Sequence, residues 1–209
     1  AYSTLGWFDD PLLDTMLARG DAELAAVLFH EMAHQHLYVK DDTLFNESFA
    51  SFVEEAGVTM WLESRAADDR LEAWTNGRQA ALEFQTLLET YRARLDRLYA
   101  SGLADPDMRA EKNRLFERLK KDWAQLTTDR WNGRNYFAGW FETDLNNARL
   151  ALLQSYRGGT CAFAALYRES GQNMPRFLRL AADKSRLEIT QRSEWLKQPC
   201  NPIAPDGKL

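Results

Sequence analysis

Histidine, cysteine and long apolar runs are scarce in this 209-residue chain, which has three histidines and two cysteines. No apolar run approaches the ~18 residues that a transmembrane helix needs, so we expect no membrane-spanning segment. Basic residues are not in excess either. The formal net charge of -5 argues against a nucleic-acid-binding protein, which would need a basic face.

The two cysteines, Cys161 and Cys200, do not form a CxxC motif, so a cysteine metal site is not expected. Two free thiols, or a disulfide in an oxidising compartment, both remain open. The chain shows no signal peptide, but it begins "AYSTLGWF" without a methionine. We therefore expect it to be part of a longer chain.

The residues that are present favour one mostly α-helical domain over residues 1–209. Apolar residues make up 45% of the chain, which is ordinary for a globular protein, and the length suffices for one sizeable core. Three parts are expected: a short N-terminal strand with two helices in residues 1–66, an antiparallel helical hairpin in 67–130, and C-terminal helices in 131–209.

Local signals give approximate bounds for the helices. One helix should begin at Asp21 and end near Asp41, and the next should begin after Asn46, a good N-cap residue. Two charged stretches around "SGLADPD" should form the hairpin, at residues 69–99 and 108–128. The C-terminal helices are expected at residues 142–156, 161–169, 174–182 and 185–196.

All three histidines lie in one stretch, "LFHEMAHQHLYVKDDTLFNESFASFVEEAG", at residues 28–57. His30, Glu31 and His34 form an HExxH sequence. Residues at i and i+4 share one helix face, so the two imidazoles can occupy two corners of a tetrahedral zinc site. Glu31 can then accept a proton from a water that the metal activates. His36 should point elsewhere.

The next helix offers two carboxylates for a third ligand, Glu47 and Glu54, which are two turns apart on one face. Ala50 and Ser51 lie between them on that face, and such small residues would let the two helices approach closely. Twelve residues separate His34 from Glu47 and nineteen separate it from Glu54.

These motifs carry a resemblance. "HEMAHQ" followed by "FNESFASFVE" is similar to the HExxH and NExxA motifs of glutamate-type zinc metallopeptidases (gluzincins), above all the aminopeptidase N-like group. More specifically, the chain resembles a bacterial family of predicted aminopeptidases. The opening "AYSTLGWFDDPLL" at residues 1–13, the motif region at 30–54 and "NNARL" at 146–150 carry this resemblance over most of the chain.

The resemblance implies a helical, zincin-like fold with Zn²⁺ held by His30, His34 and Glu47, and with Glu31 as the general base. The aminopeptidase N-like group has a longer segment between its second histidine and its glutamate. By spacing alone Glu54 fits better, but the Asn-Glu-x-x-Ala wording favours Glu47. Glu54 would then hold a ligand imidazole by its other N–H.

Other site residues follow from what peptide hydrolysis needs. Peptide substrate should lie along the one strand candidate, at Tyr2, Ser3, Thr4, Leu5 and Gly6, although this strand could equally only pack. A Tyr or Arg should stabilise the oxyanion. Tyr156 is the first candidate, and Asn146, Asn147 and Arg149 could face the cleft or serve as caps and core contacts. Tyr38 and Tyr136 are weaker candidates.

We therefore expect a zinc-dependent peptidase, and more specifically an aminopeptidase. The Gly-x-Met-Glu-Asn strand that binds the substrate ammonium in the aminopeptidase N-like group is missing, so Asp9, Asp10 or upstream residues would have to serve. The alternative is a helical binding or scaffold protein with a structural zinc site. The resemblance also implies a bacterial envelope or periplasmic protein, with a lipid anchor upstream of Ala1 as one option.

Overall fold

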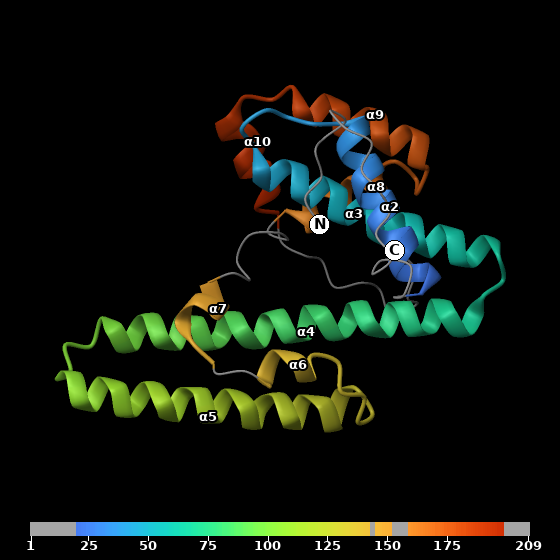
Figure 1. Ribbon diagram of the computed structural model, residues 1–209. Helices are drawn as coiled ribbons and strands as arrows, with labels where there is room; N and C mark the ends of the chain where they lie inside the picture. The colour runs from blue at the N-terminus through green and yellow to red at the C-terminus, as the bar shows by residue number, and fades with distance from the viewer. Residues whose placement is uncertain (1–19, 143–144, 152–158, 199–209) are drawn as a thin grey trace. The chain divides into compact units, whose positions relative to one another are not determined.

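The computed structural model describes residues 20–142, 145–151 and 159–198 (Figure 1). Within these ranges the chain is mostly helical and contains no strand, which confirms the predicted mostly α fold. The predicted N-terminal strand lies outside the described residues. No helix in the described part is long and apolar enough to cross a membrane.

The described residues group into two compact units. Those of residues 1–71 and 154–209 form the first unit, and those of 72–153 form the second. The first unit contains α2 (Asp21–His36), α3 (Thr43–Ser64), α8 (Thr160–Glu169), α9 (Met174–Ser185) and α10 (Ile189–Leu196). In this unit α3 is central, because it contacts α2, α8 and α10 (Figure 1).

Aromatic side chains fill the core of the first unit. Phe45, Phe49 and Phe52 of α3 pack against Phe163 of α8 and Phe177 of α9, with ring centroids 4.9 to 6.1 Å apart. All five side chains are buried. Burying rings of this size is a large favourable term, so α3 is held firmly by its apolar face and can present its other face to α2.

Small residues let α2 and α3 approach closely. Ala50 is fully buried, and a Cβ added at Gly57 would lie 2.8 Å from Cγ of Phe29 in α2. Only glycine leaves room for this ring. The close helix approach that we expected from Ala50 and Ser51 is therefore present, and Gly57 extends it by two turns.

The turn between α2 and α3 begins and ends several residues earlier than the sequence suggested. The prediction that α2 continues to about Asp41 was wrong, because Leu37 is already extended and α2 ends at His36. Asn46 is not the N-cap of α3. Asp42 takes that place and accepts a hydrogen bond of 3.0 Å from the backbone N–H of Phe45.

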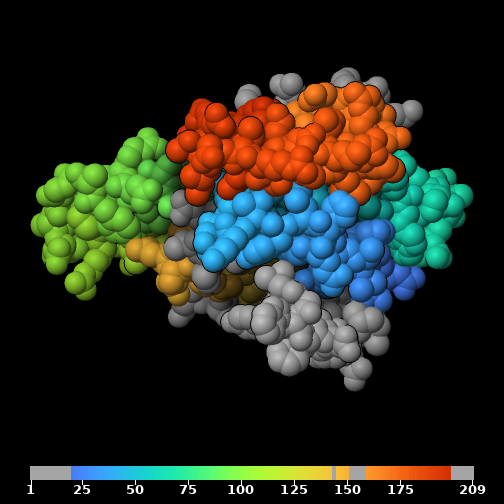
Figure 2. Space-filling model, turned by 90° about the horizontal axis from the view of Figure 1, so that it is seen from above, coloured from blue at the N-terminus to red at the C-terminus, as the bar shows by residue number. Residues whose placement is uncertain are grey.

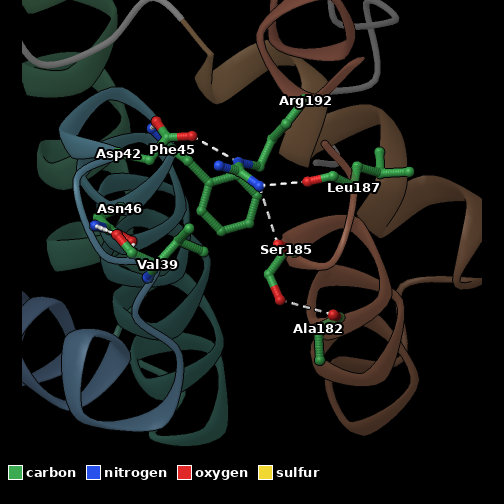
Figure 3. A network of polar contacts seen from close by, with 8 residues as sticks. All are labelled: Val39, Asp42, Phe45, Asn46, Ala182, Ser185, Leu187 and Arg192. Atoms are coloured by element: carbon green, nitrogen blue, oxygen red, sulfur yellow. Dashed lines mark hydrogen bonds and ion pairs between the residues drawn. The ribbon is translucent and has the colours of Figure 1, made fainter. Parts of the chain in front are cut away.

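Asn46 instead holds the turn with its side chain. Its Oδ1 accepts from the backbone N–H of Val39 and its Nδ2 donates to the carbonyl of Val39, both at 2.8 Å (Figure 3). Asn46 is buried, with 2% of its surface exposed. The Asn46 amide therefore satisfies both backbone groups of Val39, which lies seven residues earlier in the sequence.

Arg192 of α10 anchors the same turn from the other side. Its Nε donates to Oδ2 of Asp42 at 2.5 Å, and its Nη1 donates to the carbonyls of Ser185 and Leu187 (Figure 3). The two charged side chains are only 7% and 10% exposed. In the space-filling view the turn and α10 lie side by side at the surface (Figure 2).

Of the two alternatives for the cysteines, free thiols or a disulfide, the structure shows a disulfide at Cys161 in α8. The described part of the chain contains no free cysteine. Cys200 lies outside the described residues.

The second unit is built on the predicted hairpin. Its helices are α4 (Asp68–Tyr99) and α5 (Asp105–Arg130), followed by α6 (Ala138–Phe141) and α7 (Asn147–Ala151). Buried residues of α4 and α5, including Phe84, Leu88, Tyr91, Leu115 and Leu119, form a core of their own. The hairpin is therefore a packed unit and not only a solvated arm.

Glu83 of α4 is a polar anchor of this unit. It accepts from the guanidinium of Arg130 at 2.8 Å and from the indole N–H of Trp131 at 2.9 Å. Burial alone would raise the pKa of Glu83, but hydrogen bonds from Gln79, Arg130 and Trp131 outweigh burial and lower it.

The lowered pKa of Glu83 predicts an acid-sensitive second unit. A depressed folded-state pKa stabilises the fold above the unfolded pKa, and this contribution is lost as the pH falls through the folded value. The unfolding midpoint of Glu83→Gln should therefore change less than that of the wild type between about pH 6 and about pH 3. Thermal unfolding followed by circular dichroism measures it. Glu89→Gln, an exposed glutamate of the same helix, is the control and should behave as the wild type.

Arg192→Met should destabilise the first unit strongly. It leaves the buried Asp42 carboxylate without its cation, and such a loss costs about 3–5 kcal/mol. Arg186→Met removes an exposed pair with Asp183 and should change little. Urea titration of both variants tests the pair. Equal, small effects would show that the Asp42 contact contributes nothing to stability.

Candidate metal centre

The close approach of α2 and α3 brings four of the predicted site residues together. His30 and His34 lie one turn apart on α2, with ring centroids at 4.8 Å. Glu47 and Glu54 lie two turns apart on α3. One ligand atom each from His30, His34 and Glu47 can be chosen so that all three lie within 4.8 Å of one another.

The spacing of these atoms fits a tetrahedral metal ion. The two Nε2 atoms lie 3.2 Å apart, and the carboxylate oxygens of Glu47 lie 3.5 Å from Nε2 of His30 and 3.6 Å from Nε2 of His34. Ligands at 2.0–2.1 Å from zinc are separated by about 3.3 Å in a tetrahedron. The three residues therefore suit zinc without a large movement.

Glu54 contacts the far side of the His30 ring. Its Oε2 lies 3.1 Å from Nδ1 of His30. A carboxylate can only accept, so we assign the imidazole proton to Nδ1, and Nε2 is left with a free lone pair toward Glu47 and His34. Burial alone would lower the pKa of His30, but the hydrogen bond and charge of Glu54, with the charges of Glu47 and Glu31, raise it.

His34 is held by burial. Its side chain is 7% exposed, and burial together with the charge of His30 lowers its pKa, against the opposing effect of Glu47 and Glu31. A lowered pKa favours the neutral imidazole, which is the form that binds a metal. Its Nδ1 is buried without a hydrogen-bond partner among the described residues.

Glu31 lies close enough to act electrostatically on both histidines. Its Oε2 is buried and has no hydrogen-bond partner within the described ranges. A buried carboxylate oxygen without a donor is costly. The arrangement therefore suits a donor that enters the site, and a water molecule is the simplest one.

The remaining predicted residues have other surroundings. Oδ1 of Asn146 accepts from the backbone N–H of Arg149 at 3.0 Å, and the guanidinium of Arg149 lies over the Trp140 ring at 5.2 Å, both within the second unit. Asn147 exchanges hydrogen bonds with the hydroxyl of Tyr99. These contacts are the cap and packing roles that we left open for this segment.

The other tyrosines and histidines are not part of this cluster. Tyr38 is exposed, and Tyr136 packs against Trp131 in the second unit. His36 lines an apolar hollow of about 460 Å³ with Phe29, Met32 and other residues of α2, α3 and α9. The candidates Tyr2, Ser3, Thr4, Leu5, Gly6, Asp9, Asp10 and Tyr156 lie outside the described residues.

Three residues that shape the site were not among the residues predicted from the sequence. Gly57 allows the helix approach, Asp42 caps α3, and Arg192 holds Asp42. The Asp42 cap had a local signal, because Asp is a favoured N-cap residue. Arg192 had none, since it lies 150 positions from Asp42 in the sequence.

Comparison with known proteins identifies the family. The profile of the family described as "Putative aminopeptidase" matches residues 1–196. The chain belongs to this family, whose name suggests a peptidase. No curated protein and no solved structure matches the chain.

The geometry predicts different effects for the two carboxylates of α3. Glu47→Gln changes a carboxylate that lies against both Nε2 atoms, so it should abolish most of the zinc affinity if Glu47 is the third ligand. Glu54→Gln leaves the ligand set intact and should weaken the affinity by about 10–100-fold. Competition with a chromophoric chelator measures both. The reverse order of effects would show that Glu54 is the ligand.

Proposed function

We propose that the protein is a zinc-dependent peptidase of the gluzincin kind, with a zincin-like helical site, and that it acts as an aminopeptidase. The observation that carries this proposal is the convergence of His30, His34 and Glu47, with Glu54 behind His30. The family name supports the peptidase class. The resemblance also supports an exported location in the bacterial envelope or periplasm.

Zinc would be held by His30 Nε2, His34 Nε2 and the Glu47 carboxylate. Three protein ligands leave one tetrahedral corner for water, as in catalytic zinc sites. Bound zinc would polarise the carbonyl of a peptide bond and lower the pKa of an attacking water toward ~7.

The protein residues then have distinct roles. Glu31 takes the proton of the attacking water on its unpaired Oε2 and passes it to the leaving amine. Glu54 keeps the Nδ1 proton of His30 in place, so that the Nε2 lone pair stays directed at the metal. Neutral His34 supplies the second nitrogen.

Glu31→Gln separates proton transfer from metal binding. The amide cannot take a proton, so the peptide turnover rate should fall by about 10²–10⁴-fold, while zinc content and fold stay as in the wild type. Release of new amino termini from a mixed peptide library, with zinc measured in the same samples, gives both quantities. Glu55→Gln is the matched control. Glu55 lies on α3 next to Glu54 but has no role in the proposed site, so this variant should retain activity.

Two results would contradict the proposal. A zinc-loaded wild type that hydrolyses no peptide would favour the scaffold alternative, in which zinc is structural. A fully active Glu31→Gln would remove Glu31 as the base. The same library with acetylated amino termini tests the aminopeptidase part, because an aminopeptidase needs the free ammonium and should not cleave it.

A further inference from the structure

The connection between the two helices that carry the site is short. Only six residues, 37–42, join α2 to α3, and twelve separate His34 from Glu47. Glu47 is the fifth residue of α3, close to its N-terminal end. Helix ends are less securely held than helix interiors, because their terminal backbone groups lack partners within the helix. Some contact must therefore fix the rotation of this end of α3 against α2.

Asn46 makes that contact, one residue before Glu47. Its amide accepts from the N–H of Val39 and donates to the carbonyl of Val39, both at 2.8 Å. Only an amide side chain offers one donor and one acceptor side by side in this way. Since Asn46 is 2% exposed, water cannot readily replace these bonds.

We propose that Asn46 is the positioning residue for the metal ligand Glu47. Its paired bonds to Val39 tie the first turn of α3 to the end of the extended segment that leaves α2, and so fix where the Glu47 carboxylate lies relative to His30 and His34. The Asp42 cap and Arg192 hold the start of the same turn (Figure 3). This inference rests on the proposed zinc site.

The rotation of α3 matters because successive helix residues are separated by about 100° around the axis. A small rotation of its first turn would move the Glu47 carboxylate away from both Nε2 atoms. The distances of 3.5 Å and 3.6 Å to these atoms leave little tolerance, since ligand atoms must lie within about 0.2 Å of their ideal metal distances.

The test uses the whole chain and measures zinc affinity by chelator competition, and the visible absorption spectrum of the Co²⁺-loaded protein, which reports coordination geometry. Asn46→Ala removes both bonds to Val39. Asn46→Asp keeps the size and the acceptor but sets an oxygen against the Val39 carbonyl. Both should lose at least about 10-fold in zinc affinity and show a changed Co²⁺ spectrum.

Ser170→Ala is the matched control. Ser170 is equally buried in the same unit, and its hydroxyl donates to the backbone carbonyl of Tyr167, with the carbonyl of Asn173 at 3.3 Å. The substitution removes buried hydrogen bonding but leaves the turn between α2 and α3 unchanged. It should lower stability and leave the zinc affinity and the Co²⁺ spectrum unchanged, so loss of affinity in the Asn46 variants is not a general effect of destabilisation.

The outcomes separate this inference from the proposed function. A wild type that binds zinc, together with a Glu47→Gln that does not, supports the site. If the Asn46 variants then keep the wild-type affinity and spectrum, the positioning role is overturned while the site stands. If Asn46→Ala does not fold, Asn46→Asp decides by the same criteria. A wild type without zinc affinity overturns the site and this inference together.

Discussion

The close approach of α2 and α3 is the constraint on which the candidate site depends. Gly57 accepts the ring of Phe29 where any Cβ would collide with it. The approach places carboxylates from both helices around two imidazoles. The packing that brings the helices together therefore also brings His30, His34 and Glu47 within reach of one another.

The second requirement is that α3 keeps its rotation at that short distance. Its aromatic face is locked into the core of the first unit by Phe49 and Phe52. Its N-terminal end is fixed differently, by polar contacts of Asp42 and Asn46 that reach the preceding segment and α10. The apolar core thus sets the position of the helix, and the polar network fixes the turn at its N-terminal end.

The sequence predicted those features that depend on neighbouring residues. The bounds of α4 and α5 agree within three residues with the two charged stretches, because long helical periodicity is a strong local signal. The pairing of His30 with His34 follows from the helical repeat alone. The motif Asn-Glu-x-x-Ala, and not the spacing, favoured Glu47 over Glu54, and the structure places the Glu47 carboxylate 3.5 Å and 3.6 Å from the two Nε2 atoms.

What the sequence could not give depends on contacts between distant segments. Asn46 is a good N-cap residue by type, but Asp42 is another, and only the folded chain shows that Asn46 faces Val39. The early end of α2 has the same origin, since Leu37 adopts an extended conformation that no proline or glycine announces. The role of Arg192 could not be predicted from the sequence, because the packing of α10, and not a local pattern, brings Arg192 to Asp42.

Different contacts act on the two histidines, and their pKa values shift in opposite directions. For His30, Glu54 fixes the proton on Nδ1 and thereby frees Nε2. For His34, burial lowers the pKa and favours the neutral ring, while the ring edge lies against His30 at an interplanar angle of 79°. Because one ring is oriented by a charge and the other by packing, we expect the two Nε2 atoms to respond to different substitutions. A change at Glu54 acts on His30, a change at Glu47 acts on both rings, and a loss of burial acts on His34.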